Sequence, residues 1–157
     1  MTFKNIPLVK DTISKEDINN LIHWLETNPK LTKGELTPIF ENAWSKWIGT
    51  KYSVFLNSGS SANLAMIYSL ILSNRLKNNK IVVPSVSWVT TVTPAMQLGL
   101  EPIMCDCDKD DLGLDIDHFK LLVEKHNPAC VILVHVLGIP NKMDEIIEIC
   151  KKNDIII

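Results

Sequence analysis

The amino-acid sequence predicts an α/β fold with a mostly parallel sheet and flanking helices, and three observations support this prediction. From Lys51 onward, short apolar runs alternate with helical stretches that carry capping residues. Each helical stretch is long enough for a right-handed crossover between parallel strands. The chain has 157 residues, 46% of them apolar and 22% charged, and this composition is typical of a globular domain and excludes a disordered tail, a fibre or a coiled coil.

Residues 1–50 are predicted to form a helical segment. Ser14 and Asp17 have the spacing of a capping box, and the apolar residues that follow recur at helical spacing until Asn28-Pro29 ends the helix. A second helix is expected from Thr37, with Pro38 in its first turn, to Gly49.

Residues 51–157 are predicted to form an α/β domain that binds a cofactor. The expected strands are 53–56, 81–83, 101–105, 131–135 and 155–157, and the expected helices lie near 60–75, 89–98, 117–126 and 141–152. Asp154-Ile155-Ile156-Ile157 has the pattern of a buried parallel strand that has just begun. We therefore expect this domain to be truncated at its C-terminus, so that the chain is the N-terminal part of a longer protein.

Charge and composition exclude several kinds of partner and compartment. The 16 basic and 18 acidic residues form no long block of one sign, so no nucleic-acid partner is expected. The uncharged stretch 81–100 contains two prolines and several hydroxyl residues, so we expect no membrane span. The four cysteines and the absence of a signal sequence at Met1–Lys10 predict a reduced, cytoplasmic protein.

The segment Asn57–Asn63 is a candidate anion site, because it follows an apolar run and opens an expected helix. Gly59 permits a tight turn, Ser60 and Ser61 offer hydroxyl and main-chain donors, and the helix start adds partial positive charge. The alternative is an ordinary turn capped by serine. The segment lacks the Lys of a Walker loop and the second glycine of a nucleophile elbow, which disfavours acyl transfer.

Trp88 is the second candidate, because its loop follows the next strand along the chain, where the loops of a parallel sheet meet a ligand crevice. There its indole could stack on a flat ring, whereas the alternative is a tryptophan that fills the core. An anion site and an indole ring that can stack on a ligand, both at the same end of the sheet, together indicate a flat, phosphorylated cofactor.

Two further groups of residues are functional candidates. Cys105-Asp106-Cys107-Asp108 resembles a metal cluster, but alternation along a strand puts the cysteines on one face and the aspartates on the other, so buried thiols and no metal site are expected. His135 ends an expected strand and could line the crevice, although a structural histidine is the commoner case.

The sequence resembles the N-terminal part of the DegT/DnrJ/EryC1/StrS family of pyridoxal-phosphate-dependent sugar aminotransferases, whose large domain has the aspartate-aminotransferase-like fold (fold type I). The matching pieces run in order from about Leu31 to Ile157 and are Leu31–Gly34, Phe40-Glu41, Asn57–Ala62, Pro84 with Trp88 and Thr91, Gly99–Pro102, Asp106–Asp108, His135–Gly138 and Met143-Asp144.

The resemblance implies that Gly59, Ser60 and Ser61 hold the phosphate of pyridoxal 5′-phosphate and that Trp88 covers its ring. The implied enzyme transfers an amino group from a donor such as glutamate to a nucleotide-linked 4-keto-6-deoxy sugar, and the complete protein would be a homodimer. Within the family, the segments Gly59–Asn63 and Thr90–Pro94 are similar to the branch that includes the 3-dehydratases of the same sugars.

No catalytic residue is assigned within this chain. The resemblance implies that three family positions follow Ile157: the aspartate that pairs with the pyridine nitrogen, the Schiff-base lysine of the aminotransferases and the histidine that replaces it in the dehydratases. We therefore expect the isolated chain to be inactive. An alternative of another class is a non-catalytic module that binds a phosphorylated ligand, or a partner subunit.

Overall fold

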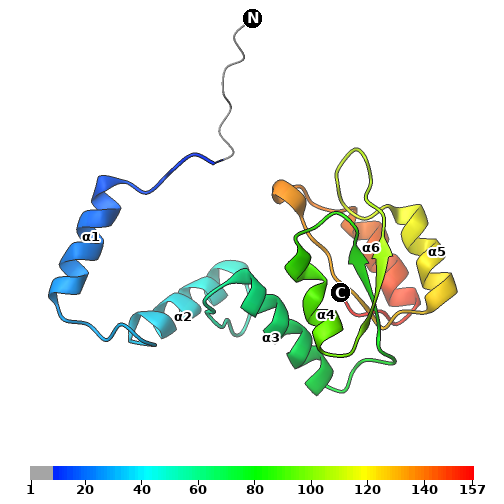
Figure 1. Ribbon diagram of the computed structural model, residues 1–157, viewed down its shortest axis with the longest axis horizontal. Coiled ribbons are helices and arrows are strands. Elements are labelled where there is room, and N and C mark those ends of the chain that lie inside the picture. The colour runs from blue at the N-terminus through cyan, green and yellow to red at the C-terminus, as the bar shows by residue number, and fades with distance from the viewer. Residues whose placement is uncertain (1–8) are drawn as a thin grey trace, which may run out of the picture. The chain divides into compact units, whose positions relative to one another are not determined.

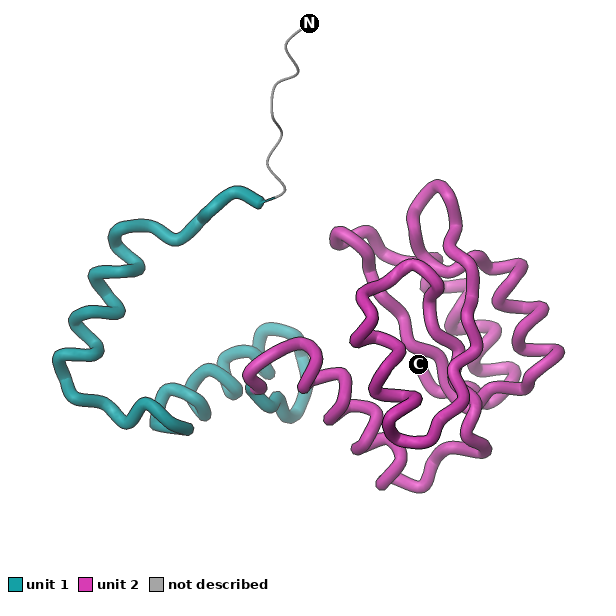
Figure 2. The backbone as a smooth tube through the Cα atoms, viewed as in Figure 1, with its two compact units in different colours: residues 1–55 teal, residues 56–157 magenta. Residues whose placement is uncertain are grey.

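The computed structural model describes residues 9–157, so the first eight residues of the Met1–Lys10 stretch lie outside the described part. The chain divides into two compact units, one ending at Phe55 and the other running from Leu56 to Ile157 (Figure 2). No helix in the described residues is both long enough and apolar enough to span a membrane.

The first unit contains the helices α1, Lys15–Glu26, and α2, Leu36–Ile48. The predicted capping box is present, because the Ser14 side chain accepts the Asp17 N–H and the Asp17 carboxylate accepts the Ser14 N–H. Gly49, with φ of 75°, ends α2 in the left-handed conformation that favours glycine.

The predicted strand 53–56 is absent, because this segment packs on α2 instead of joining a sheet. The Phe55 N–H donates to the Glu41 carboxylate at 2.9 Å, and the Phe55 ring meets the Phe40 ring edge-on at 5.4 Å. The apolar run was correctly located, but a strand also requires a neighbouring strand to accept its backbone hydrogen bonds.

The second unit is a parallel sheet covered by helices on both faces, as the sequence predicts (Figure 1). The strands are β1, Lys80–Pro84, β2, Glu101–Cys105, and β3, Cys130–Val131, in the order β2-β1-β3. Ile156 forms a parallel bridge to Cys130, so the expected final strand is present only as one bridged residue. Of the expected strand 131–135, only Val131 lies in β3, which begins one residue earlier, at Cys130.

Helices of the second unit form the two outer layers of the domain. They are α3, Gly59–Leu72, α4, Thr93–Gln97, α5, Ile116–His126, and α6, Met143–Lys152, with short 3₁₀ helices η1, Val89–Thr91, and η2, Val136–Gly138. The expected helix 89–98 is split into η1 and α4, because Pro94 has no N–H and is suited to the first turn of a new helix.

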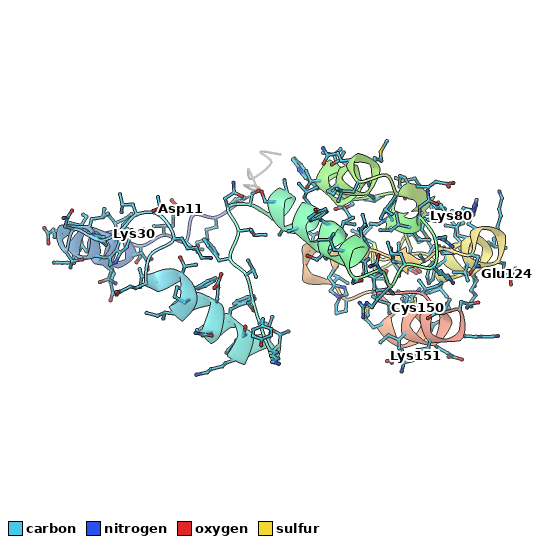
Figure 3. All side chains as sticks on the ribbon, turned by 90° about the horizontal axis from the view of Figure 1, so that it is seen from below. Asp11, Lys30, Lys80, Glu124, Cys150 and Lys151 are labelled. Carbon is cyan, nitrogen blue, oxygen red and sulfur yellow. The ribbon has the colours of Figure 1, made fainter. Side chains whose placement is uncertain are left out.

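Alternation along β1 builds a core on each face of the sheet. Val82 packs with Phe119 of α5 and Ile146 of α6 on one side, whereas Ile81 and Val83 pack with α3 and α4 residues on the other. The same division holds within helices: Cys150 of α6 points toward the sheet while its neighbour Lys151 points outward (Figure 3). This packing fixes the sheet edge from which the candidate functional loops emerge.

Candidate functional site

Loops that follow β1, β2 and β3 emerge from the same edge of the sheet, because the three strands are parallel (Figure 1). We call this the carboxyl edge; its loops are residues 85–92, 106–114 and 132–142. In parallel α/β sheets this edge is where ligands bind.

The N-terminus of α3 presents the predicted anion donors. Ser58 is the N-cap, and its hydroxyl oxygen accepts the Ser61 N–H at 3.1 Å. The Ala62 N–H bonds to the Ser58 carbonyl, which leaves the Gly59 and Ser60 N–H groups without an acceptor among the described residues. Two free amides and two serine hydroxyls at a helix start suit a phosphate group.

Serine capping of this helix, the alternative that the sequence left open, is therefore also present, but a different serine performs it. Ser58 supplies the cap, which occupies the Ser61 N–H, and the Ser58 hydroxyl also donates to the Ser61 hydroxyl at 3.2 Å, whereas Ser60 is exposed. Sequence reasoning missed the cap at Ser58, because any of the three serines fits the start of a helix.

Trp88 lies on the surface, with 77% of its area exposed, at the N-cap of η1. The loop around it is held from inside: Thr91 is buried, and its hydroxyl lies 2.7 Å from the Ser87 hydroxyl. The Trp88 ring thus contributes nothing to the described core and is free to cover a flat ligand. The exposed position contradicts the alternative in which Trp88 fills the core.

Asn63 joins the two candidate segments. Its side-chain amide, one turn into α3, donates to the Thr90 carbonyl in η1 at 2.9 Å. The start of α3 and the loop of Trp88 therefore lie beside each other at the carboxyl edge. Sequence reasoning did not identify this bond, since nothing in the order of residues indicates which asparagine reaches across to a neighbouring loop.

Cys105 is a buried free thiol, as predicted, but Cys107, for which burial was also expected, is only half-buried, and Cys130 and Cys150 are two further buried thiols. Burial raises the pKa of Cys105 to about 12, with the nearby Asp115 and Asp106 carboxylates adding to the shift, and burial raises the pKa values of Cys130 and Cys150 to about 11. The Cys105 thiol donates to the Asp115 carbonyl at 3.7 Å. The three buried thiols are protonated at neutral pH and form part of the core.

Polar contacts also fix the other two loops at the carboxyl edge. Asp108 pairs with Lys142, and this hydrogen bond lowers the pKa of Asp108 and raises that of Lys142. Asn141, which the sequence assigned to the start of a helix, lies before α6 and is buried. Pro140 next to Asn141 is typical of a helix start. The local sequence therefore did not indicate that the Asn141 side chain is buried between two loops.

Comparisons with known proteins place these residues in a wider group. A family model described as the DegT/DnrJ/EryC1/StrS aminotransferase family matches residues 11–157. The GDP-4-keto-6-deoxy-D-mannose 3-dehydratase of Yersinia pseudotuberculosis is 35% identical over 156 residues, which cover 98% of this chain and 39% of the relative. The enzyme of the same name from Escherichia coli O55:H7 is 36% identical over 98% of this chain and 40% of the relative.

Solved structures give the same grouping. E. coli GDP-4-keto-6-deoxy-D-mannose-3-dehydratase with bound hydrated PLP matches with a TM-score of 0.87 and 36% identity, over 96% of this chain and 39% of that chain. Helicobacter pylori PseC, an aminotransferase, matches with a TM-score of 0.83 at 22% identity, over 97% of this chain and 40% of that chain, which supports the fold alone. The chain thus spans about two fifths of the length of these relatives.

Proposed function

The chain belongs to the DegT/DnrJ/EryC1/StrS aminotransferase family, and on that premise we propose that it is the N-terminal part of a pyridoxal-phosphate-dependent 3-dehydratase acting on a nucleotide-linked 4-keto-6-deoxy sugar. The observation that carries this proposal is the identity of 35% and 36%, over 98% of the chain, to two enzymes of that name. The solved aminotransferase matches at only 22%.

The residues at the carboxyl edge fit pyridoxal 5′-phosphate. The free Gly59 and Ser60 amides and the Ser60 and Ser61 hydroxyls would hold the phosphate, and the exposed Trp88 indole would cover one face of the ring. When bound, the cofactor supplies an electron sink for the bonds that the reaction breaks. The role of this chain is to anchor the phosphate, orient the ring and shield one of its faces from water.

Amino transfer from glutamate to the same class of sugar is the second candidate, and the description of the family model favours it. Both enzymes would use the same cofactor and the same phosphate and ring contacts. The residues that differ between them are those that the family resemblance puts after Ile157. A non-catalytic ligand-binding module or partner subunit is the remaining alternative.

We also propose a cytoplasmic homodimer for the complete enzyme. Three buried free thiols are compatible with a reducing compartment. Apolar side chains of α1 and α2 are exposed, and a subunit interface would cover such faces.

The decisive test incubates the complete enzyme with GDP-4-keto-6-deoxy-D-mannose, pyridoxal phosphate and glutamate, and identifies the sugar by mass spectrometry and NMR. A product that has lost its 3-hydroxyl supports the dehydratase, and a product with an amine at C4 supports the aminotransferase. Enzyme stripped of cofactor is the control. Unchanged substrate with fully loaded enzyme would favour the non-catalytic module.

A further inference from the structure

Asn141 is the central residue of a hydrogen-bond network at the carboxyl edge. Its side chain is buried, with the residue only 5% exposed. Its Oδ1 accepts the Leu114 N–H at 2.8 Å, and its Nδ2 donates to the Val134 carbonyl at 2.9 Å. Because one backbone partner is a donor and the other an acceptor, the orientation of this amide is fixed.

This fixed amide determines the tautomer of His135. Nδ1 of His135 lies 3.1 Å from Nδ2 of Asn141, and it also accepts the Asn141 backbone N–H at 3.2 Å. Both neighbours are donors, so Nδ1 must be the acceptor and carries no hydrogen. The neutral imidazole therefore carries its hydrogen on Nε2.

That Nε2–H group is available to a ligand. His135 is exposed, and no described residue forms a hydrogen bond with Nε2. β3 lies next to β1, and the ladder continues with the Ile132 N–H donating to the Val82 carbonyl at 2.9 Å. The loops that follow β1 and β3 therefore leave the same edge of the sheet from adjacent strands (Figure 1), and by sequence position they contain Trp88 and His135 respectively.

We propose that His135 is a ligand-binding residue that donates its Nε2–H to an anionic oxygen of a molecule bound at the carboxyl edge, and that Asn141 is the positioning residue that fixes this donor. This inference rests on the proposed function, since it requires a ligand at that edge. The acceptor is a phosphate oxygen of the cofactor or of the nucleotide sugar, or the phenolate oxygen of the cofactor. A donor that is already held in a single tautomer binds a charged oxygen more tightly, because its hydrogen need not be rearranged on binding.

Two substitutions of His135 separate the inward contact from the outward one. In His135→Asn, the amide oxygen can take the place of Nδ1 and keep the Asn141 contact, but the outward donor is lost. In His135→Gln, the amide nitrogen can reach the position of Nε2 and restore that donor. Each variant of the complete enzyme is titrated separately with pyridoxal phosphate and with GDP.

We expect His135→Asn to weaken one of these two ligands by about 10-fold or more, the scale of one hydrogen bond to a charged group. His135→Gln should recover most of that loss, and the ligand that responds identifies the source of the oxygen. Equal affinities for both ligands in wild type and His135→Asn would overturn the inference while leaving the proposed function intact. A wild-type enzyme that binds no pyridoxal phosphate would overturn both.

The positioning role of Asn141 has its own readout, the tautomer of His135, measured by ¹⁵N NMR on the 157-residue chain. His23 is an internal reference for the opposite tautomer, because its Nδ1 lies 2.8 Å from the Asn19 carbonyl and must donate. We expect the His135 signals to show Nε2–H in the wild type and to move toward Nδ1–H in Asn141→Asp, whose carboxylate accepts a hydrogen. A wild-type His135 that populates both tautomers equally would overturn the positioning role without any variant.

Discussion

At the residue scale, Trp88 shows most clearly how the structure decides between two interpretations of one sequence pattern. A tryptophan in an apolar stretch fits both a core position and a stacking position, and only the backbone path separates them. The buried Thr91 takes the inward position of this loop, which leaves the indole outside. A large aromatic surface exposed to water beside free phosphate donors indicates a ligand contact.

Substitution of Trp88 should therefore affect ligand binding more than folding. Trp88→Ala is expected to change the free energy of unfolding of the apo protein by about 0.5 kcal/mol or less, as is usual for surface positions. Cofactor affinity should fall roughly 2- to 10-fold through lost stacking. A denaturant melt and a pyridoxal phosphate titration of the complete enzyme measure the two effects. A loss of several kcal/mol of stability with normal binding would show that the ring is part of the core.

A substitution at Gly113 tests how rigid the hydrogen-bond network around Asn141 is. A Cβ added at Gly113 would lie 2.7 Å from Oδ1 of Asn141 and 2.9 Å from a carboxylate oxygen of Asp111. Oδ1 cannot move away freely, because it accepts the buried Leu114 N–H. Gly113→Ala should cost about 1 to 3 kcal/mol of unfolding free energy.

The matched control for this prediction is Gly59→Ala, where a Cβ meets nothing within 4 Å. Thermal or urea denaturation of both variants of the chain compares them directly. Equal stability of Gly113→Ala and the wild type would mean that Asn141 can rearrange, which would also weaken its assignment as a positioning residue.

At the element scale, the start of α1, the end of α2 and the position of β1 could be predicted from the sequence, because they depend on local chemistry. Ser14 with Asp17, Gly49 after α2 and the apolar run of β1 each act within a few residues of themselves. Segment 53–56 could not be predicted in this way, since its contacts are with Glu41 and Phe40, more than ten residues earlier. The same limit applies to the Asn63–Thr90 and Asn141–Leu114 hydrogen bonds, each of which joins residues 27 positions apart.

The cap and the phosphate donors of α3 can be separated experimentally, because they belong to different serines. Ser58→Ala removes the side chain that accepts the Ser61 N–H and should cost about 1 kcal/mol of stability. The double variant Ser60→Ala/Ser61→Ala should keep that stability and weaken pyridoxal phosphate binding, with hydrogen bonds of roughly 1.5 to 3 kcal/mol each setting the upper limit. Unchanged affinity in the double variant, measured by titration of the complete enzyme, would restrict this helix start to a structural role.

Buried thiols in β2, β3 and α6 should be protected from alkylation and should make the fold sensitive to alkali. Iodoacetamide at pH 8 is expected to label the partly exposed Cys107 first, as mass spectrometry of the intact chain can show. Folding raises the pKa of Cys105 from 9.0 to about 12, so between these values the unfolded thiol ionises while the folded one stays protonated. Stability should therefore fall as pH rises through that interval. Labelling of Cys105 by iodoacetamide as fast as Cys107 would contradict the expected protection of the buried thiols.

At the scale of the whole molecule, the two units differ in how much apolar surface they cover. The second unit buries the residues of β1 between two helical layers. The first unit buries little: α1 has no buried residue, and the side chains of its apolar face remain 44–49% exposed, namely Ile18, Leu21, Ile22 and Leu25. An amphipathic helix gains most of its stability from packing its apolar face, so this face requires a cover.

The 157-residue chain on its own is therefore expected to self-associate. Light scattering after size exclusion should show a mass above 17.7 kDa that increases with concentration. Ile22→Glu places a charge on the apolar face of α1 and should reduce the association. Asn20→Glu adds the same charge on the opposite side of that helix, 200° from Ile18 at about 100° per residue, and should leave association unchanged. A monodisperse wild-type monomer with a cooperative melt would show that α1 is stable with its apolar face exposed to water. Equal effects of Ile22→Glu and Asn20→Glu would mean that net charge, and not this face, controls the association.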